Sequence, residues 1–258
     1  MVRAGNSEAH PQAPRPVVAM ARDYPDGSVI EPHSHPRGQL LYAATGLMHV
    51  STGTAGWIVP PFRAVWIPPG VRHQVSMKGP VQMRTLYLLP GASVGIPEEC
   101  TVVEVSLLLR ELILGAVDES LDDDPQGRGG LIMGLILLEI PRASRVPLRI
   151  PMPSDPRLVR LCGALLDRPN KKESFEGLAR RTGASSRTLA RLFQQDLGMS
   201  FVAWRQQVLL SEAVVLLASG KTVKEVASTL GYQSPSAFTA MFRQNLGKAP
   251  EAFLKSRG

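Results

Sequence analysis

The sequence predicts a two-domain α+β protein: a small β-barrel or sandwich with a helical hairpin, then an all-α domain with two helix-turn-helix units. Three observations support this. Residues 17–90 contain short β-branched and aromatic runs that Gly and Pro interrupt at intervals typical of small barrels and sandwiches. Helical periodicity begins near Thr101, and one helical pattern occurs twice between residues 176 and 247. A chain of 258 residues is long enough for two compact domains with separate cores.

Composition indicates where the two domains meet. Residues 1–15, rich in Ala, Pro and polar types, are expected to form a disordered tail. Residues 16–140 form the first expected domain, which we interpret as a sensor and dimerisation domain. Residues 141–155 form an expected linker, because five prolines occur in the sixteen residues from Pro141 to Pro156. Residues 156–258 form the second expected domain.

Charge is distributed unequally between the two halves. Residues 156–258 contain 16 Lys and Arg against 7 Asp and Glu, whereas residues 1–155 contain 13 against 15. A nearly neutral half joined to a basic half indicates a sensor module attached to a module that binds a polyanion. Apolar content of 44% with 20% charged residues is typical of a soluble globular protein.

The cysteines and the apolar runs indicate the cellular compartment that we expect for this protein. Cys100 and Cys162 lie far apart in different expected domains, so no disulfide framework is expected and a reducing cytoplasm fits. Cys162, among leucines, is expected to be buried. We find no signal peptide, and the longest apolar run, around residues 131–138, is too short to span a membrane. A cytoplasmic protein without a membrane partner is expected.

Two apolar helices are predicted at the end of the first domain. One covers 101–117, with Val103, Leu107 and Ile113 along one broad face, and the other covers 131–140 after an acidic loop. A hairpin of two such helices can form a dimer interface or cover the open end of the barrel. We favour the dimer interface.

The repeated pattern of the second domain is a helix-turn-helix. The first copy spans residues 176–198 and the second spans residues 224–247. Each has a small Ala where two helices cross closely, and a Gly four residues later where the turn needs an open backbone. These pairs are Ala179 with Gly183, and Ala227 with Gly231.

A long helix from Ser200 to about Ser219 is predicted between the copies. We expect its inner side to consist of Phe201, Trp204, Val208, Leu209, Val215 and Leu216. At about 1.5 Å per residue it spans roughly 30 Å, close to the length of about 34 Å for one turn of B-DNA. Such a spacer could place two recognition helices in successive major grooves.

The first recognition helix is predicted from Ser186 to about Leu197, with Ser185 as its N-cap. Arg187 and Arg191 are the candidates for reading bases, since Arg can pair bidentately with guanine O6 and N7. The alternative is that both contact only phosphates. Leu189, Leu192 and Phe193 are expected to face inward, and Arg187, Ala190, Arg191 and Gln194 outward.

The second recognition helix has Ser234 as its expected N-cap and Pro235 at its first position, where the missing N–H is harmless. The inward residues are Phe238, Met241 and Phe242, and the outward residues are Ser236, Thr239, Ala240 and Arg243. Because the outward side chains are mostly short, we expect this helix to be the weaker reader, with Arg243 on phosphate.

With these motifs, residues 155–256 resemble the DNA-binding domain of AraC/XylS-family transcriptional regulators. The resemblance implies double-stranded DNA as a partner in the major groove. A homodimer is the expected form, and RNA polymerase is a candidate partner, although no surface readable in the sequence specifies that contact. Ala190 and Ala240 depart from the long polar side chains common at these positions. The resulting DNA-binding candidates are Ser186, Arg187, Ala190, Arg191, Gln194, Pro235, Ser236, Thr239 and Arg243.

The first domain contains a second set of spaced residues: Gly27, His33, His35, Gln39 and Gly46, followed by Pro68, Pro69, Gly70 and His73. This spacing resembles the two motifs of cupins and of the cupin-like sensor domains on some AraC-family proteins. His33 and His35 alternate by two, so both point to the same side of a strand. Gln39 stands where metal cupins have Glu, and Met77 where the second motif usually ends in Asn.

Two interpretations of this cupin-like barrel remain open. His33, His35, Gln39 and His73 could hold one divalent transition metal ion, since imidazole suits Zn, Fe, Ni or Cu. Alternatively, these histidines hydrogen-bond within the barrel or contact an organic effector. Candidate effector contacts are Arg37, Tyr42, Trp57 and Trp66.

The sequence therefore predicts a sequence-specific DNA-binding transcription regulator whose cupin-like domain senses a small molecule or metal ion and modulates operator binding. The alternative is a metal-dependent cupin enzyme fused to a DNA-binding domain. Gln39 argues against it, because non-haem iron oxygenases use two His and one carboxylate. The sequence specifies neither the effector nor the operator, nor whether binding activates or represses.

Overall fold

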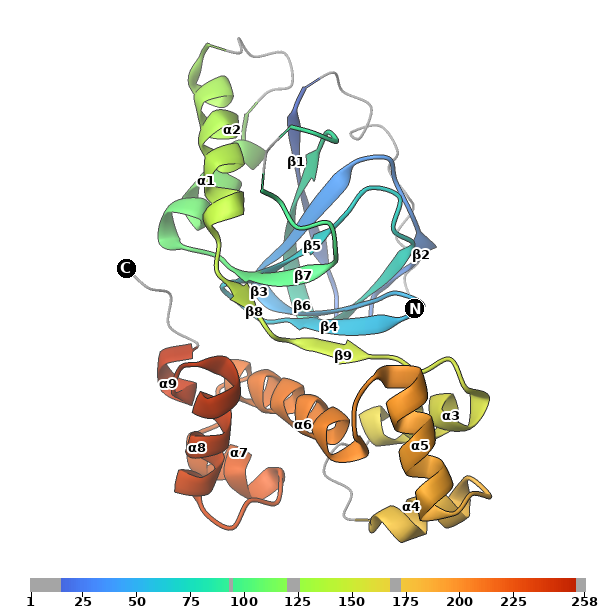
Figure 1. Ribbon diagram of the computed structural model, residues 1–258. Coiled ribbons are helices and arrows are strands. Elements are labelled where there is room, and N and C mark those ends of the chain that lie inside the picture. Colours follow the sequence, from blue (N-terminus) through green and yellow to red (C-terminus); the bar gives the residue numbers. More distant parts are fainter. Residues whose placement is uncertain (1–14, 93–94, 120–125, 168–172, 254–258) are drawn as a thin grey trace. The chain divides into compact units, whose positions relative to one another are not determined.

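The computed structural model describes residues 15–92, 95–119, 126–167 and 173–253 (Figure 1). It divides into two compact units with separate cores. The first contains residues up to Thr52, Trp57–Pro147 and the segment from Ala252; the second contains Gly53–Gly56 and Leu148–Glu251. The expected disordered tail falls almost entirely on residues 1–14, which lie outside the described residues.

The first unit is built around an antiparallel sheet. Its long strands β3 and β6 pair along most of their length, from Gly38 opposite Leu88 to Ser51 opposite Gln74. Strand β1 pairs with the second half of β6, and β2 with its beginning. The strands are β1 (Val17–Tyr24), β2 (Val29–His33), β3 (Gly38–Ser51), β4 (Ala55–Val59), β5 (Arg63–Ile67), β6 (His73–Leu88) and β7 (Thr101–Glu104).

Helices α1 (Leu107–Val117) and α2 (Arg128–Glu139) lie against one side of this sheet (Figure 1). Their buried faces join Leu40, Tyr42 and Trp66 in one apolar core. Since side chains alternate along a strand, Gln39 and Leu41, which flank Leu40 on β3, point to the opposite side of the sheet. The helical hairpin therefore covers one face of the sheet, and the other face carries Gln39 together with buried apolar side chains such as Leu41 and Val65.

The predicted helix over 101–117 is wrong in its first part. Thr101–Glu104 forms strand β7, which pairs with β5 from Arg63 to Trp66. Val102 and Val103 are β-branched and fit a buried strand, and the sheet supplies the partner that a local periodicity cannot show. The helix begins only at Leu107, with Ser106 as its N-cap.

The proline-rich segment after α2 contains regular elements. A 3₁₀ helix covers Ile140–Arg142, strand β8 covers Arg145–Val146 and pairs with β7, and strand β9 covers Arg149–Pro151. The Met152 N–H donates to the Thr54 carbonyl at 2.8 Å. The boundary between the units falls between Pro147 and Leu148, within the predicted linker.

The second unit is mainly helical, and five of its helices in the described residues begin at a Ser or Thr N-cap. Ser174, Ser185, Ser200, Thr222 and Ser234 each accept a hydrogen bond from the N–H three residues later. Both predicted caps, Ser185 and Ser234, are confirmed. The helices are α3 (Pro156–Asp167), α4 (Phe175–Arg181), α5 (Ser186–Leu197), α6 (Phe201–Ala218), α7 (Val223–Thr229), α8 (Pro235–Leu246) and α9 (Pro250–Phe253), the last of which extends into the first unit.

Helix α6 is buried on more sides than predicted. Trp204, Val208 and Val215 are buried as expected, but Leu209 and Leu216 are half-buried, whereas Leu210, Val214 and Leu217 are buried. A helix with partners on several sides has no single apolar face, so helical periodicity assigns its inner residues poorly.

By length and composition α6 is the one helix, among the described residues, that could cross a membrane, with 44% of it buried inside the protein. It packs between the two helix-turn-helix units, and core helices of soluble proteins meet the same criteria.

Candidate nucleic-acid interface and histidine cluster

The first recognition helix is α5. Its turn from α4 passes through Gly183, which has a φ of +70° that favours Gly. Leu189 and Phe193 are fully buried, and Phe193 contacts the Trp204 ring at a centroid distance of 6.0 Å. Packing therefore determines which face of α5 remains open. The exposed residues on that face are Arg187, Ala190, Arg191 and Gln194, and Ser186 is half-buried.

The second recognition helix is α8. Phe238 and Phe242 are fully buried, as in the first copy, and Gly247 ends the helix with a φ of +72°. Pro235, Ser236, Ala240 and Arg243 are exposed and Thr239 is half-buried. The outward side of α8 borders an open hollow of about 740 Å³, lined by Pro235, Ser236, Thr239, Ala240, Arg243 and Gln244.

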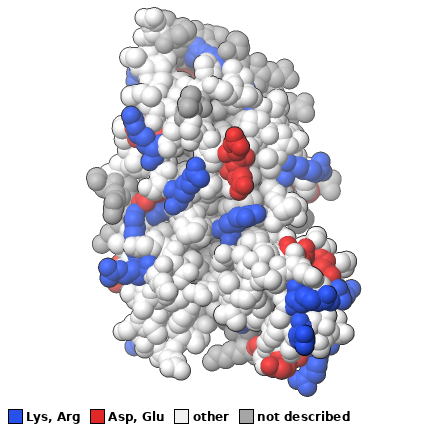
Figure 2. Space-filling model, viewed as in Figure 1, with Lys and Arg blue, Asp and Glu red and all other residues white. Residues whose placement is uncertain are grey.

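The structure places the predicted DNA-reading residues on one outward face of each recognition helix. It adds Gln195 on α5 and Gln244 on α8, at corresponding positions and both exposed. The sequence analysis named neither residue, although each lies four positions after a predicted outward residue, Arg191 or Ala240, and so on the same face of its helix. Figure 2 shows Lys and Arg side chains gathered over the region where Figure 1 places α4 and α5, with a few Asp and Glu between them.

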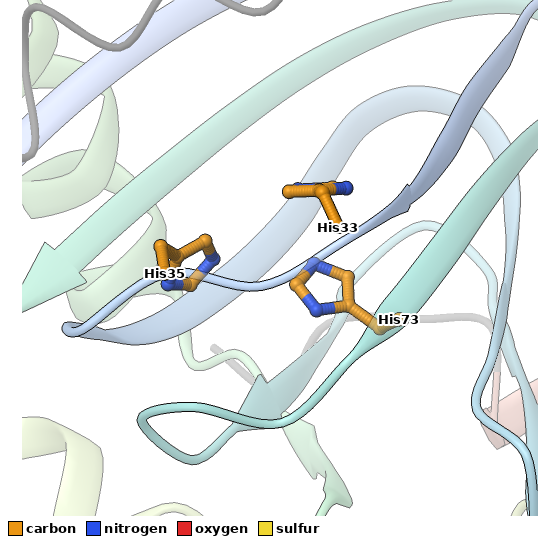
Figure 3. A group of neighbouring side chains, drawn as sticks. All are labelled: His33, His35 and His73. Atoms are coloured by element: carbon orange, nitrogen blue, oxygen red, sulfur yellow. The ribbon is translucent and has the colours of Figure 1, made fainter.

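Three histidines converge in the first unit. His33 ends β2, His35 follows two residues later, and His73 begins β6, directly opposite His33 in the sheet. Their rings point toward one another (Figure 3), with centroids 4.4 Å apart for His33 and His73 and 5.3 Å for His35 and His73. One potential ligand nitrogen from each ring lies within 4.8 Å of the other two. The motif spacing predicted this convergence.

The hydrogen bonds define which nitrogens are available. Nδ1 of His33 lies 2.9 Å from the Glu31 carbonyl, Nδ1 of His35 2.6 Å from that of Arg37, and Nδ1 of His73 2.9 Å from that of Val71. A carbonyl oxygen only accepts, so each Nδ1 donates its hydrogen. In the neutral rings of His33 and His73 this leaves Nε2 as a lone pair, whereas His35 Nε2 lies against the Gln39 amide oxygen, which is itself an acceptor. Histidines that bind metals are commonly oriented in this way, through an N–H bond to a carbonyl.

Burial keeps part of the cluster uncharged. His73 is 1% exposed, and its Nε2 is buried without a hydrogen-bond partner among the described residues. Desolvation by burial lowers the pKa of His73 to about 4, and it also lowers the pKa of His33. Both rings are therefore neutral near pH 7, the form that binds a metal ion.

Gln39 lies beside the cluster. Its Oε1 is 2.9 Å from His35 Nε2, and its Nε2 donates to Thr85 Oγ1 and to Tyr87 Oη, both at 3.1 Å. Burial raises the pKa of Tyr87 to about 12, so this phenol stays protonated. Thr85 and Tyr87 were missed in the sequence because they lie on β6, far from the motif, and reach Gln39 only through strand pairing.

The candidate effector residues do not form one pocket. Tyr42 and Trp66 belong to the core under α1 and α2. Arg37 is buried and donates to the Arg15 carbonyl at 2.8 Å, and Trp57 is buried elsewhere, on β4. Trp66 borders a separate cavity of about 310 Å³, lined mainly by apolar residues and prolines, including Pro68, Leu88, Leu89, Pro90, Ile96 and Pro97.

A sheet domain with a convergent polar cluster, followed by two helix-turn-helix units with exposed recognition helices, defines a class: a DNA-binding regulator that carries its own ligand-binding domain. Comparison with known proteins specifies the family. Residues 15–127 match the family model of the AraC-like ligand binding domain, and residues 178–256 match a helix-turn-helix domain model. The chain belongs to the AraC family of helix-turn-helix transcriptional regulators.

One relative supports this assignment along most of the chain, and two further matches cover parts of it. The HTH-type transcriptional regulator NimR of Escherichia coli is 33% identical over 222 residues, which cover 86% of this chain and 81% of that protein. The arabinose operon regulatory protein of the same species is 25% identical over 133 residues, 50% of this chain and 46% of its own length. The DNA-binding domain of AdpA, solved with a target DNA, is 32% identical, covers 39% of this chain and 91% of its own, and has a TM-score of 0.36.

The chain is thus a transcription regulator with a ligand-binding domain and a helix-turn-helix DNA-binding domain. The alternative of a cupin enzyme is not supported, because the relatives are transcription regulators.

Proposed function

We propose that the first domain binds one divalent transition metal ion at His33, His35 and His73, and that this ion modulates operator binding by the second domain. The observation that carries the proposal is the orientation of the rings. All three Nδ1 atoms lie against main-chain carbonyls, which leaves the Nε2 atoms of His33 and His73 as lone pairs beside His35, whose Nε2 would exchange its contact with Gln39 Oε1 for the ion.

Electrostatics favours a cation at this point. Lone pairs on neighbouring neutral imidazoles repel one another, and His73 Nε2 has no donor to relieve this among the described residues. Imidazole ligands suit Zn, Cu, Fe or Ni, and an ion bound there would supply a Lewis-acid centre to which a small molecule could add. Gln39 offers a neutral amide and no carboxylate, which supports a sensing role over iron oxygenase chemistry.

Metal content tests this proposal directly. We expect elemental analysis of protein purified without a chelator or a His tag to find about one equivalent of a transition metal per chain. The variant His33→Ala should lose it, and His49→Ala, which changes a half-buried histidine outside the cluster, should keep it. Protein that takes up no metal even on reconstitution with Zn²⁺, Ni²⁺ or Cu²⁺ would contradict the proposal.

A second candidate effector is an apolar small molecule in the cavity beside Trp66. The cavity has the size of a small-ligand site and a mainly apolar lining. A ligand there should quench Trp66 fluorescence and raise the melting temperature, whereas Trp66→Phe should abolish the quenching. A ligand that acts equally on His33→Ala and wild-type protein would favour this site over the metal site.

We also propose a homodimer formed through α2 and the start of α1. Leu131, Leu135 and Leu138 recur at helical spacing on α2 and are 65%, 45% and 56% exposed. Leu107 and Leu108 on α1 are 42% and 51% exposed. Such a cluster of exposed leucines is expected to be covered, and a second copy offers a matching surface. The dimer would bind direct or inverted half-sites.

Sedimentation of the full chain tests the dimer. Leu135→Glu should convert dimer to monomer. Val202→Glu is the matched control, since Val202 is apolar and 71% exposed but lies on α6 in the second unit. An unchanged sedimentation coefficient for Leu135→Glu would contradict this interface.

Contact with RNA polymerase and a cytoplasmic location complete the proposed function. Both are supported by membership in a family of transcription regulators. Transcription in vitro from a promoter carrying the operator, with and without the protein, would test whether the regulator acts on polymerase.

A further inference from the structure

Asp196 makes the longest-range set of side-chain hydrogen bonds from the first recognition helix. Its Oδ2 accepts the N–H of Ser154 at 2.8 Å and the N–H of Asp155 at 2.9 Å. Its Oδ1 accepts the Ser154 hydroxyl at 2.6 Å. Three donors from one dipeptide thus meet one carboxylate, which joins the last turn of α5 to the segment just before α3.

The position of this carboxylate is unfavourable for α5 alone. Asp196 is the penultimate residue of the helix, where the negative end of the helix dipole disfavours an acidic side chain. The contacts to residues 154 and 155 offset this cost, and the bond from the Asp155 N–H is the largest cause of the lowered pKa of Asp196. Adjacent N–H groups form a small anion-binding concavity, which an amide in place of the carboxylate would fit poorly.

Within the described part of the chain, the second copy of the motif shows no corresponding connection. Asn245 occupies the position in α8 that Asp196 occupies in α5, and its Nδ2 donates to the Met241 carbonyl of the same helix at 2.8 Å. The two copies bury side chains at the same core positions, and only the first has a carboxylate here, so the motif does not in general require one.

The segment that Asp196 holds is also the covalent entry to the second unit, which begins at Leu148. Just before it, the Pro151 carbonyl accepts the Trp204 indole N–H at 2.8 Å, and Trp204 packs on Phe193 of α5. Residues 151–155 are therefore bonded to both α6 and α5 (Figure 1 shows β9 leading into α3).

We infer that Asp196 is a positioning residue, which sets the orientation of α5 from the segment 151–155 and so supports sequence-specific binding by the first helix-turn-helix. The inference rests on the DNA-binding function of the family and deepens it. It also identifies where a change in the first domain would reach the recognition helix, because residues 154–155 bond directly to the end of α5, a connection that α8 does not make to any of the described residues.

The experiment compares two kinds of DNA. A duplex selected from a random library by the full wild-type protein serves as the specific site, and a scrambled duplex of equal composition as the control. Asp196→Asn should weaken binding to the selected duplex about tenfold. Binding to the scrambled duplex should stay unchanged or strengthen, because removal of a negative charge favours phosphate contact.

Two further variants separate positioning from charge and from stability. Asp155→Asn removes the same charge from the adjacent residue, which bonds Arg157, and keeps both backbone donors to Asp196. It should retain specific affinity. Ser154→Ala removes one donor from the opposite side and should reduce specific affinity in the same direction, by less. Circular dichroism at the assay temperature should show all variants folded.

The outcomes are distinct. Equal losses on both duplexes, an unchanged Asp196→Asn variant, or an equal loss in Asp155→Asn would overturn the inference and leave the function of the protein intact. A wild-type protein that enriches no sequence from the library would overturn the function and the inference together.

Discussion

The two helix-turn-helix units have matching cores and different outward faces. Leu189 and Phe193 of α5 correspond to Phe238 and Phe242 of α8, and all four side chains are fully buried. Outside, the residues that correspond to Arg187 and Arg191 are Ser236 and Ala240. The two units therefore share the positions of their buried residues, whereas their exposed side chains make α5 a stronger candidate than α8 for contacts with bases.

This difference separates two requirements on one motif. In both copies, packing restricts the inner residues to side chains that fill the space between the helices. The outer residues are exposed and not subject to this packing, so they can differ between the copies as expected for residues that contact DNA. In addition, Asp196 connects α5 to Ser154, which lies outside its own motif, whereas Asn245 donates to a carbonyl within α8.

The largest expected effect tests whether the cores of the two helix-turn-helix units contribute equally to the stability of the second domain. Phe193→Ala and Phe242→Ala should each destabilise the second domain by about 3–5 kcal/mol, since each removes a fully buried aromatic ring. Denaturant unfolding monitored by circular dichroism measures both. A loss at only one position would show that the two copies are not equivalent in packing.

The next largest effect tests whether the exposed faces of α5 and α8 differ in how they bind DNA. Arg191→Ala gives α5 the residue that α8 has at Ala240, and should weaken binding to the selected duplex by about 1–3 kcal/mol if Arg191 reads a base. Arg243→Ala should instead reduce binding to selected and scrambled duplexes alike, as expected for a phosphate contact. Equal losses on both duplexes for Arg191→Ala would assign it to phosphate as well.

A smaller effect concerns the helix starts. Ser185→Ala and Ser234→Ala each remove the hydroxyl that accepts an N–H at 3.1 Å, and should each cost about 1 kcal/mol of stability. Pro235 restricts the first turn of α8 without an N–H of its own, so Ser234→Ala should be the milder of the two. Thermal unfolding of both variants measures the difference.

The smallest effect is a pH dependence confined to the first copy. The pKa of Asp196 is lowered from 3.8 in the folded state, so the stabilisation by its carboxylate is fully present above that value. It is lost as the pH falls through the lowered pKa. The amide resonance of Ser154 should shift in that window, and Asp196→Asn should abolish this shift, whereas the Asp155 amide also responds to its own carboxyl, whose pKa the bonds from Arg157 lower to about 2. A resonance that moves identically in the variant would exclude Asp196 as the titrating group.

Much of the second domain could be predicted, because its signals are local. Ser185 and Ser234 are caps defined by their own and the next few residues, and Gly183 and Gly198 occupy turns that need a positive φ. The face of α5 follows from one helical period. Helix α6 was harder, since Leu210 and Leu217 are buried by partners that lie on different sides.

By itself, the sequence determined the two repeated motifs, their caps, the charge difference between the halves and the spacing of His33, His35 and His73. All of these depend on residues close in the chain or on a recognisable pattern. Only the tertiary structure decided that Thr101–Glu104 is a strand, that Thr85 and Tyr87 reach Gln39, and that Asp196 binds residues 154 and 155. Each of these requires partners between 35 and 48 positions apart, and no local propensity encodes them.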